Sequence, residues 1–304
     1  MVERTPSRWT PVILVVVVLI VAGAGAGVVY YLAHPGATGP LASVAVGSNV
    51  TVNYIGSFGA GPQQGRVFDT SYESVALNNL TYPKALEFTL RSPLSEYSPL
   101  GVHVGALAPS SGYTIDNITF GTVVTGFWQG LLGMTVGSTR TITIPPNLGY
   151  GPLVPSCLVS MPLTVTAPVV TTVPAANFSA LYPNVTAQPG TVFAAAPYNW
   201  TALVLNANAT GVTVEALPTL GESVTVQGIP ARVSGISSTT ITVSLELTAA
   251  DAGLVLGQAT TSVCGTSQFI VSSVSPSTGN FTANFNSEVV GATLQFTVSL
   301  VQFY

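Results

Sequence analysis

The sequence predicts an α+β fold that is rich in strands and carries an N-terminal transmembrane helix. Runs of alternating apolar and polar residues recur along most of the chain, and this period of two is typical of half-buried strands. One stretch, residues 126–134, instead spaces its apolar residues as a short helix does. A length of 304 residues is enough for about two domains.

Charge is scarce in this chain. Only 6% of the residues are charged and 47% are hydrophobic, whereas an ordinary globular chain carries about 25% charged residues. Nucleic-acid binding is therefore excluded, because it needs clustered Lys and Arg and the basic residues here are scattered. Intrinsic disorder is equally excluded, since disordered segments are poor in apolar residues. The seven basic residues are Arg4, Arg8, Arg66, Lys84, Arg91, Arg140 and Arg232.

The N-terminus has the composition of a membrane anchor. Residues 11–33 form 23 uncharged positions, which as a helix would span about 34 Å, more than a hydrocarbon core of about 30 Å. Arg4 and Arg8 lie only on the N-terminal side, so the positive-inside rule predicts a cytoplasmic segment 1–10 and an extracytoplasmic remainder. A cleaved secretory signal is the alternative, because small-residue triplets occur at 22–26. The prediction is a single-pass protein of the cell membrane with a linker at 34–42.

The elements that follow can be predicted in order. Alternation predicts a strand at 47–56, and shorter strands are expected at 66–70 and 86–90. After the short helix at 126–134, alternation resumes at 138–144 and is stopped by Pro145 and Pro146, which cannot continue a ladder.

Five motifs in this order carry a resemblance. VNYIG (52–56), VFDTS (67–71), VVTGFWQGLLGMTVG (123–137), IPPNLGYG (144–151) and a closing strand at 285–301 are similar to the FKBP family of peptidyl-prolyl cis/trans isomerases. About 130 residues separate the last two motifs. That interruption resembles the SlyD-like and archaeal long-type branch, in which a further domain is inserted in the flap. The resemblance implies an antiparallel sheet around one short helix at 43–153 plus 283–304, interrupted by an insert at 154–282.

The resemblance also implies which residues form the site. Phe127 would lie at the floor of an apolar pocket, with Asp69 and the Tyr150 hydroxyl as its polar groups and the Val124 amide holding a substrate carbonyl. The remaining residues would contact substrate; they are Tyr54, Phe68, Leu86, Val123, Val124 and Phe296. Taken singly, Tyr54 and Phe296 read equally well as plain core residues of a sheet. Leu86 stands where the family usually has an aromatic, and residues 91–122 are longer than in simpler members, so substrate selectivity stays open.

The implied chemistry needs no nucleophile, metal or cofactor. Rotation about an X-Pro bond has a barrier of about 18 to 20 kcal/mol, because the amide loses resonance as it twists. An enzyme lowers that barrier by binding the twisted amide better than the planar one. The expected activity is peptidyl-prolyl isomerisation of unfolded or proline-containing polypeptide clients. His34 and His103 are isolated, so neither a catalytic triad nor a histidine metal site can be assembled.

The insert reads as one or two all-β subdomains, because alternating runs separated by turn residues recur through it. Strands are expected at 202–206, 210–215, 224–227, 239–247 and 269–274. In the resembling branch the insert captures unfolded chains as a chaperone, which would give peptide-binding roles to Phe178 and Trp200. Both residues read equally well as core residues.

Two further features concern the exterior of the chain. Eight asparagines begin an N-x-Ser/Thr triplet and are candidate glycosylation sites: Asn49, Asn79, Asn117, Asn177, Asn184, Asn199, Asn208 and Asn280. Cys157 and Cys264 have no metal-like spacing, and a disulfide between them is possible outside the cell.

Two other functions are compatible with the sequence. The protein could be a catalytically weak holdase or peptide-binding module. It could also be a glycosylated surface protein that keeps the fold for structure alone.

Overall fold

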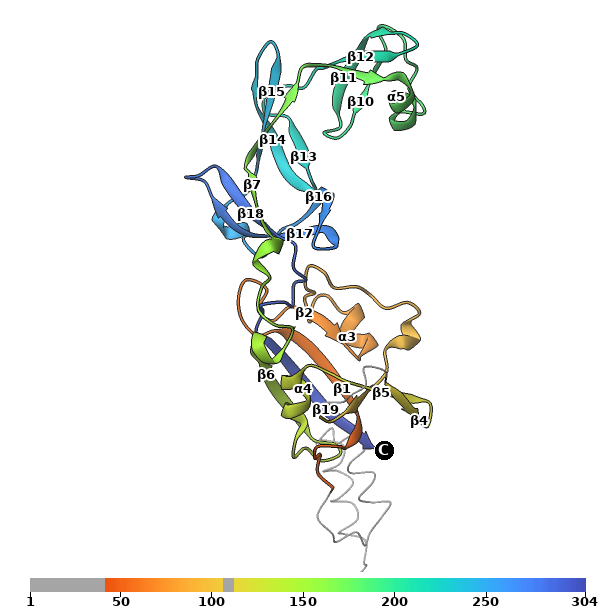
Figure 1. Cartoon of the computed structure of the whole chain (residues 1–304), viewed down its shortest axis with the longest axis vertical. Helices are drawn as coiled ribbons and strands as arrows, with labels where there is room; N and C mark the ends of the chain where they lie inside the picture. Colours follow the sequence, from red (N-terminus) through yellow and green to blue (C-terminus); the bar gives the residue numbers. More distant parts are fainter. Residues whose placement is uncertain (1–41, 106–111) are drawn as a thin grey trace, which may run out of the picture. The chain divides into compact units, whose positions relative to one another are not determined.

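The computed structural model describes residues 42–105 and 112–304, which separate into two compact units (Figure 1). Unit 1 runs to Pro152 and resumes at Val289–Tyr304, and unit 2 is Leu153–Glu288. The division differs by a few residues from the predicted one, which placed the return to the first domain at 283, inside the last strand of unit 2.

Unit 1 is built on a seven-stranded sheet in the order β4-β5-β3-β1-β19-β6, with β2 paired to β1. The first and last of the described strands lie side by side, since β1 and β19 pair antiparallel from Val50 opposite Phe303 to Phe58 opposite Leu294. The strands are β1 (Asn49–Phe58), β2 (Val67–Thr70), β3 (Leu100–His103), β4 (Tyr113–Ile115), β5 (Ile118–Gly121), β6 (Thr139–Ile144) and β19 (Leu294–Phe303).

The helix α4 (Thr125–Leu131) packs on strand β6 because two of its residues lack side chains. A Cβ atom at Gly126 would lie 2.6 Å from Ile144 Cγ2, and one at Gly130 would lie 2.5 Å from Ile142 Cγ2. This close approach puts Phe127 and Leu131, both fully buried, into the core of unit 1. The other regular pieces of unit 1 are the helix α3 (Glu73–Leu77) and the 3-10 turns η1 (Leu94–Glu96) and η2 (Pro146–Leu148).

Unit 2 contains three four-stranded sheets that share one plan. In each, a three-stranded meander is completed by one strand of a single extended stretch: β9 pairs with β12, β8 with β15 and β7 with β18. The strands of the extended stretch are β7 (Leu158–Pro162), β8 (Thr164–Pro168) and β9 (Val170–Pro174). The meander strands are β10 (Val192–Ala195), β11 (Trp200–Ala207), β12 (Gly211–Ala216), β13 (Ser223–Val226), β14 (Ile229–Ile236), β15 (Thr240–Leu245), β16 (Leu256–Val263), β17 (Thr266–Ser275) and β18 (Asn280–Asn284).

The three sheets repeat in detail as well as in plan. Pro162, Pro168 and Pro174 each end their strand opposite the first residue of the partner strand. Proline is tolerated there because these are edge strands. Against the third strand of its meander, each of the middle strands β11, β14 and β17 shifts register once, after Val204, Val233 and Val271 respectively. Three modules of one architecture therefore make up unit 2, where one or two subdomains were predicted.

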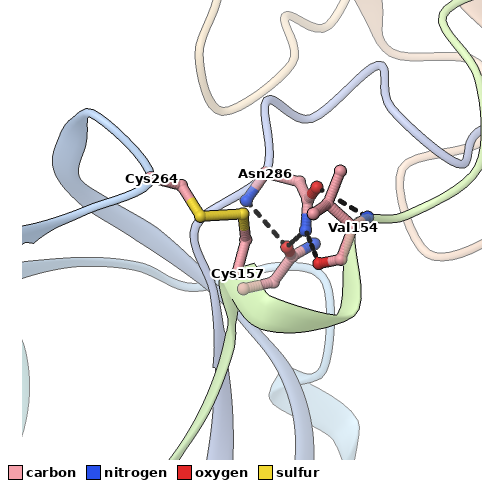
Figure 2. Close-up of a disulfide and its surroundings, with 5 residues drawn as sticks. Val154, Cys157, Cys264 and Asn286 are labelled. Carbon is pink, nitrogen blue, oxygen red and sulfur yellow. Dashed lines mark hydrogen bonds between the residues drawn. A yellow bond between two sulfur atoms is a disulfide. The ribbon is translucent and has the colours of Figure 1, made fainter.

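The start of the extended stretch is tied to the end of unit 2. A disulfide joins Cys157, in the 3-10 turn η3 (Pro155–Cys157), to Cys264 in the turn between β16 and β17 (Figure 2). The Asn286 side chain accepts a hydrogen bond from Val154 N–H at 3.0 Å and donates one to Val154 O at 3.3 Å. The η3 turn is therefore held by the disulfide and by the Asn286 side chain, whose amide bonds both the N–H and the carbonyl of Val154.

The predicted membrane topology is corrected by the structure. No helix within 42–105 or 112–304 is long and apolar enough to cross a membrane. The longest helices there, α4 and α5, have seven residues each and span about 10 Å, against a hydrocarbon core of about 30 Å. The structure thus gives no transmembrane helix and no single-pass localisation; residues 1–10 and 11–33, and most of the predicted linker 34–42, lie outside the described part of the chain.

Two predictions of secondary structure are also wrong. Residues 86–90 form turns and irregular chain rather than a strand, because Leu86 N–H bonds to the Gln63 side chain and Phe88 N–H bonds back to Ala85 O. The insert is not all-β, since the helix α5 (Ala175–Leu181) follows β9 and a 3-10 turn η4 (Ala249–Asp251) precedes β16. The predicted strands at 47–56, 66–70 and 138–144 and the helix near 126–134 are present.

Candidate active site

An aromatic cluster lies between β1, β2, β19 and α4 of unit 1. The Phe127 and Phe296 ring centroids are 4.9 Å apart with the planes nearly perpendicular, and Phe68 meets Phe296 edge-on at 5.4 Å. The Tyr54 ring contacts both Phe127 and Phe296 at just over 6 Å. Edge-to-face pairs at these spacings are favourable beyond the area that they bury. The structure therefore brings together four residues that the sequence assigned to one site.

Glycine at position 56 makes the cluster possible. A Cβ atom there would lie 2.8 Å from both Phe296 and Phe68. Because these contacts are with aromatic rings packed against each other, a side chain at Gly56 would have to displace one of them.

A polar network borders the cluster at Tyr54. Its hydroxyl donates to Asp69 Oδ2 at 2.5 Å and accepts from Arg91 Nη2 at 3.0 Å. The same Arg91 nitrogen forms an ion pair with Asp69 Oδ1 at 2.7 Å, and Thr70 N–H donates to that oxygen at 2.9 Å. Burial, followed by the charge of Asp69 and the hydrogen bond to it, raises the pKa of Tyr54 well above its ordinary value, so Tyr54 remains a protonated donor.

Tyr150 is the polar group that is open to solvent. It follows the turn η2, its side chain is about half exposed, and its hydroxyl makes no hydrogen bond with any described residue. Partial burial raises its pKa, and the negative charge of Asp69 raises it further. The Tyr150 hydroxyl is therefore protonated and available to donate a hydrogen bond to a ligand.

The entrance to α4 supplies a backbone donor. Val124 is the N-cap of this helix, so its N–H has no acceptor within the helix. The side chains of Val123 and Val124 are half-buried and pack against the same core as Phe127. Leu86 is half-buried too, but Phe88 rather than Leu86 packs against that core.

Arg91 is the residue that sequence reasoning missed. It was set aside with the other scattered basic residues, although Asp69 needs a partner in a chain with so few charges. The scarcity of charge was the signal that could have found it.

The insert has its own apolar cavity of about 200 Å³, lined by residues of the β10-β11-β12-β9 sheet and by Ala167 and Pro168 of β8. Trp200, Tyr198 and Tyr182 line it together with Pro197 and Val173. Trp200 stacks on Tyr198 with centroids 4.3 Å apart. Phe178 is not among the lining residues; it is 1% exposed and packs on Tyr182 and Phe193 as core.

The candidate glycosylation sites differ in accessibility. Six are exposed, whereas Asn49 and Asn280 are partly buried. The Asn49 side chain accepts hydrogen bonds from Tyr113 and lies 2.9 Å from the His103 ring nitrogen, and Thr51 of its triplet is buried. Glycosylation stays a prediction, with Asn49 as the site least suited to it. Within the described residues no group of three His, Cys, Asp or Glu could hold a metal ion.

Comparison with known proteins shows a similarity to peptidyl-prolyl isomerases over part of the chain. A family model described as FKBP-type peptidyl-prolyl cis-trans isomerase matches residues 113–173, which include α4, β6 and Tyr150. Over 87 residues the chain is 37% identical to a short-type peptidyl-prolyl cis-trans isomerase of Methanocaldococcus jannaschii, covering 29% of this chain and 41% of that protein.

Shorter matches agree with this class. The chain is 61% identical over 31 residues to FK506-binding protein 2B of Rhizopus delemar, covering 10% of this chain and 15% of that protein. It is 56% identical over 34 residues to FK506-binding protein 2 of Dictyostelium discoideum, covering 11% and 26% respectively. The chain thus spans less than half the length of each of these relatives. The chain is therefore similar to FKBP-type peptidyl-prolyl cis-trans isomerases over part of its length, and the similarity supports peptidyl-prolyl isomerase activity.

Proposed function

We propose that this protein is a peptidyl-prolyl cis/trans isomerase whose catalytic site is the aromatic cluster of unit 1. One observation supports the proposal most directly. An almost fully buried aromatic cluster, formed by Tyr54, Phe127 and Phe296, occurs in the same unit as Tyr150, whose hydroxyl has no described hydrogen-bond partner. A planar amide is more dipolar than a twisted one, so an apolar surround disfavours the planar ground state.

Each polar group has a distinct proposed role. The Tyr150 hydroxyl and the Val124 N–H donate to substrate carbonyls and hold the chain on either side of the twisting bond. Asp69 accepts hydrogen bonds from Tyr54, Thr70 and Arg91, so its proposed role is to orient the Tyr54 ring. Phe68, Val123 and Phe127 supply the apolar contact. The reaction forms and breaks no covalent bond and needs no cofactor.

We propose further that unit 2 captures unfolded polypeptide and belongs to the insert-in-flap arrangement of the SlyD-like and archaeal long-type branch. The cavity lined by Trp200, Tyr198 and Tyr182 supports this role, because aromatic side chains bury large apolar areas of a ligand at low entropic cost. The unit is inserted between Pro152 and Val289, after the Tyr150 motif.

The proposed activity is tested by the refolding of a protein whose slow phase is limited by proline isomerisation. We expect the parent chain to accelerate that phase. Two variants should accelerate it less: Phe127→Leu, which keeps an apolar side chain in the core, and Tyr150→Phe, which removes only a hydroxyl. A matched control is Tyr72→Phe, outside the cluster, which leaves the rate unchanged. A folded parent that fails to accelerate refolding would contradict the proposal and favour a peptide-binding module instead.

A further inference from the structure

A second cavity of unit 2 lies beside an edge strand. Its volume is about 390 Å³, which is within the usual range for ligand pockets. Ser223, Val224 and Thr225 of β13 line it. Because β13 is the end strand of the β13-β14-β15-β8 sheet, only one of its sides is paired with a described strand. The cavity therefore borders a strand with an unpaired side.

The backbone of Ser223 points toward this unpaired side. Successive residues of a strand direct their N–H and C=O groups to opposite sides within the plane of the sheet. Glu222 directs its carbonyl toward β14, because that oxygen accepts a hydrogen bond from Val233 N–H at 2.9 Å. Ser223, the next residue, therefore turns its backbone groups away from β14.

The backbone of Thr225 points the same way. Thr225 lies opposite Pro230 in the pairing of β13 with β14. The Pro230 carbonyl points to the other neighbouring strand, since it accepts a hydrogen bond from Glu246 N–H, just after β15, at 2.8 Å. Residues directly opposite in an antiparallel pair either bond to each other or both face away. Thr225 therefore also offers its N–H and C=O at the unpaired side.

The sequence of β13 leaves this edge unprotected. Its four residues, SVTV, include no charge and no proline, which are the usual features that blunt an edge strand. Ser223 and Thr225 are exposed, and outside the pairing with β14 their backbone groups bond to no residue within 42–105 or 112–304. Free groups in this arrangement are satisfied by an extended polypeptide that joins the sheet as a further strand.

Tyr198 connects this cavity with the one lined by Trp200. The Tyr198 ring lines both cavities and stacks on Trp200. Trp200 and Val224 belong to one buried cluster, so the same packed core carries both cavities. A chain that places a side chain in the Trp200 cavity can therefore continue along β13. Because Tyr198 and Asn199 line the β13 cavity as well, a single extended segment fits it better than the sheet edge of a second folded copy.

Resting on the capture role proposed for unit 2, we infer that β13 binds an extended segment of a client polypeptide as an added strand. The outward backbone groups of Ser223 and Thr225 bond to the segment, and side chains of the segment contact Tyr198. Backbone bonds give such a site its affinity, and a proline in the segment removes one donor. The substrate class is therefore a proline-free, β-forming stretch of an unfolded chain.

The test measures the binding of a fluorescein-labelled peptide of alternating Thr and Val to the full chain by fluorescence anisotropy. Ser223→Pro and Thr225→Pro each remove one outward N–H and keep the bonds to β14. Each is expected to raise Kd by about three- to tenfold, the equivalent of one backbone hydrogen bond. The same peptide with methylated backbone nitrogens should bind the parent at least as weakly as the plain peptide binds these variants.

Ser160→Pro is the matched control on another edge strand of unit 2. Ser160 is an exposed residue of β7 and lines neither cavity. Leu163 bonds toward the partner strand through its N–H to Gly279 O, so alternation turns the Ser160 backbone outward. Ser160→Pro is therefore the same change at an equivalent edge position, and Kd should stay at the parent value.

Amide hydrogen exchange of the parent gives a measurement that needs no variant. Addition of the peptide should slow exchange of the Ser223 and Thr225 amides, because only a bound strand covers them. Thermal unfolding establishes that each proline variant is folded before its Kd is compared. Sedimentation of the parent without peptide is expected to show no association through β13.

The outcomes separate this inference from the proposed functions. Binding that is equal in the parent and the folded proline variants, or unaffected by methylation of the peptide, overturns the β13 site and leaves capture at the Trp200 cavity standing. A parent dimer that Thr225→Pro abolishes also overturns it, because a second copy would then occupy the edge. A folded parent that binds no peptide overturns the capture role together with this inference, while acceleration of proline isomerisation in a short peptide is unaffected.

Discussion

At the scale of the residue, the site contains two kinds of polar group: those with hydrogen-bond partners in the protein and those without. Asp69 has its oxygens engaged by Tyr54, Thr70 and Arg91, while the Tyr150 hydroxyl has no described partner. Saturated groups hold a geometry, and unsaturated groups are available to a ligand. The two tyrosines therefore play different roles although both border the same cluster.

Removal of the Tyr150 hydroxyl should reduce activity without reducing stability. In Tyr150→Phe, kcat/KM for a proline peptide is expected to fall by about three- to tenfold, the equivalent of one neutral hydrogen bond. The midpoint of urea unfolding should stay within error, because half of this side chain is already exposed. A large loss of stability would show that the hydroxyl is structural.

Tyr54 makes stability depend on alkaline pH. Its pKa is raised in the folded state, so between pH 10 and that raised pKa the unfolded chain releases a proton that the folded chain retains. The stability that Tyr54 contributes is thus present below pH 10 and is lost as the pH rises, by up to about 1.4 kcal/mol for each pH unit.

Unfolding of Tyr54→Phe measured between pH 8 and 11.5 checks this linkage. The variant should lose about 1 to 2 kcal/mol at neutral pH, because Asp69 loses a donor, and its stability should fall less steeply above pH 10. Tyr97→Phe is a control from the same region. Equal slopes in the parent and Tyr54→Phe would contradict the linkage.

At the scale of the element, two glycines without side chains set the position of helix α4. Gly126 and Gly130 let it lie against Ile144 and Ile142 of β6, and that contact sets the depth of Phe127 in the cluster. Glycine is normally unfavourable within a helix by up to about 1 kcal/mol relative to alanine. Its use here indicates that close packing outweighs helix propensity.

Gly130→Ala should therefore destabilise unit 1 despite the better helix former. The added methyl would meet Ile142 side-chain atoms at 2.5 to 2.8 Å, and overpacking of this kind costs about 1 to 3 kcal/mol. Gln129→Ala, next to it but exposed, should change stability by less than about 0.5 kcal/mol. Denaturant unfolding of both variants decides the point, and a stabilised Gly130→Ala would mean that the helix can move away from β6.

Some of these elements could be predicted from the sequence and others could not. Alternation was sufficient for β1 and β6, and the apolar spacing of 126–134 was sufficient for α4, because in each case one face is buried. Residues 86–90 carry the same alternation but turn instead, because the Gln63 side chain, distant in sequence, takes the Leu86 amide. Arg91 was missed because the turn at 86–90 sets the position of the residues that follow it, and that position decides whether Arg91 reaches Asp69.

At the scale of the whole molecule, unit 2 is a threefold repetition on one extended stretch. Each meander borrows its fourth strand from β7, β8 or β9, which end in proline at six-residue intervals. Sequence analysis predicted five of the nine meander strands, namely β11, β12, β13, β15 and β17. It did not predict that three sheets share one stretch, because strand pairing over long separations leaves no local pattern.

The disulfide should contribute chiefly to unit 2. It joins positions 107 residues apart, and the loop-entropy model assigns such a closure at most about 4 to 5 kcal/mol. Cys157→Ser with Cys264→Ser should lower the thermal transition of unit 2 and leave that of unit 1 in place, as resolved by calorimetry. Equal shifts in both transitions would contradict a local role.

Unit 1 should remain an isomerase without unit 2. Its two chain ends meet where Gly291 N–H donates to Gly151 O at 2.8 Å, so a short Gly/Ser link can replace residues 153–288. The shortened protein should keep its activity on short peptides and lose much of its acceleration of protein refolding. Undiminished acceleration of refolding would contradict the proposed capture role of unit 2.

We propose that the aromatic cluster of unit 1 catalyses rotation about X-Pro bonds. The most direct test is the cis/trans exchange rate of a short proline peptide, measured by NMR with and without the full chain. We expect the full chain to make the exchange faster, and we expect this acceleration to be smaller with Phe127→Leu and with Tyr150→Phe. An unchanged exchange rate in the presence of the folded parent would contradict it.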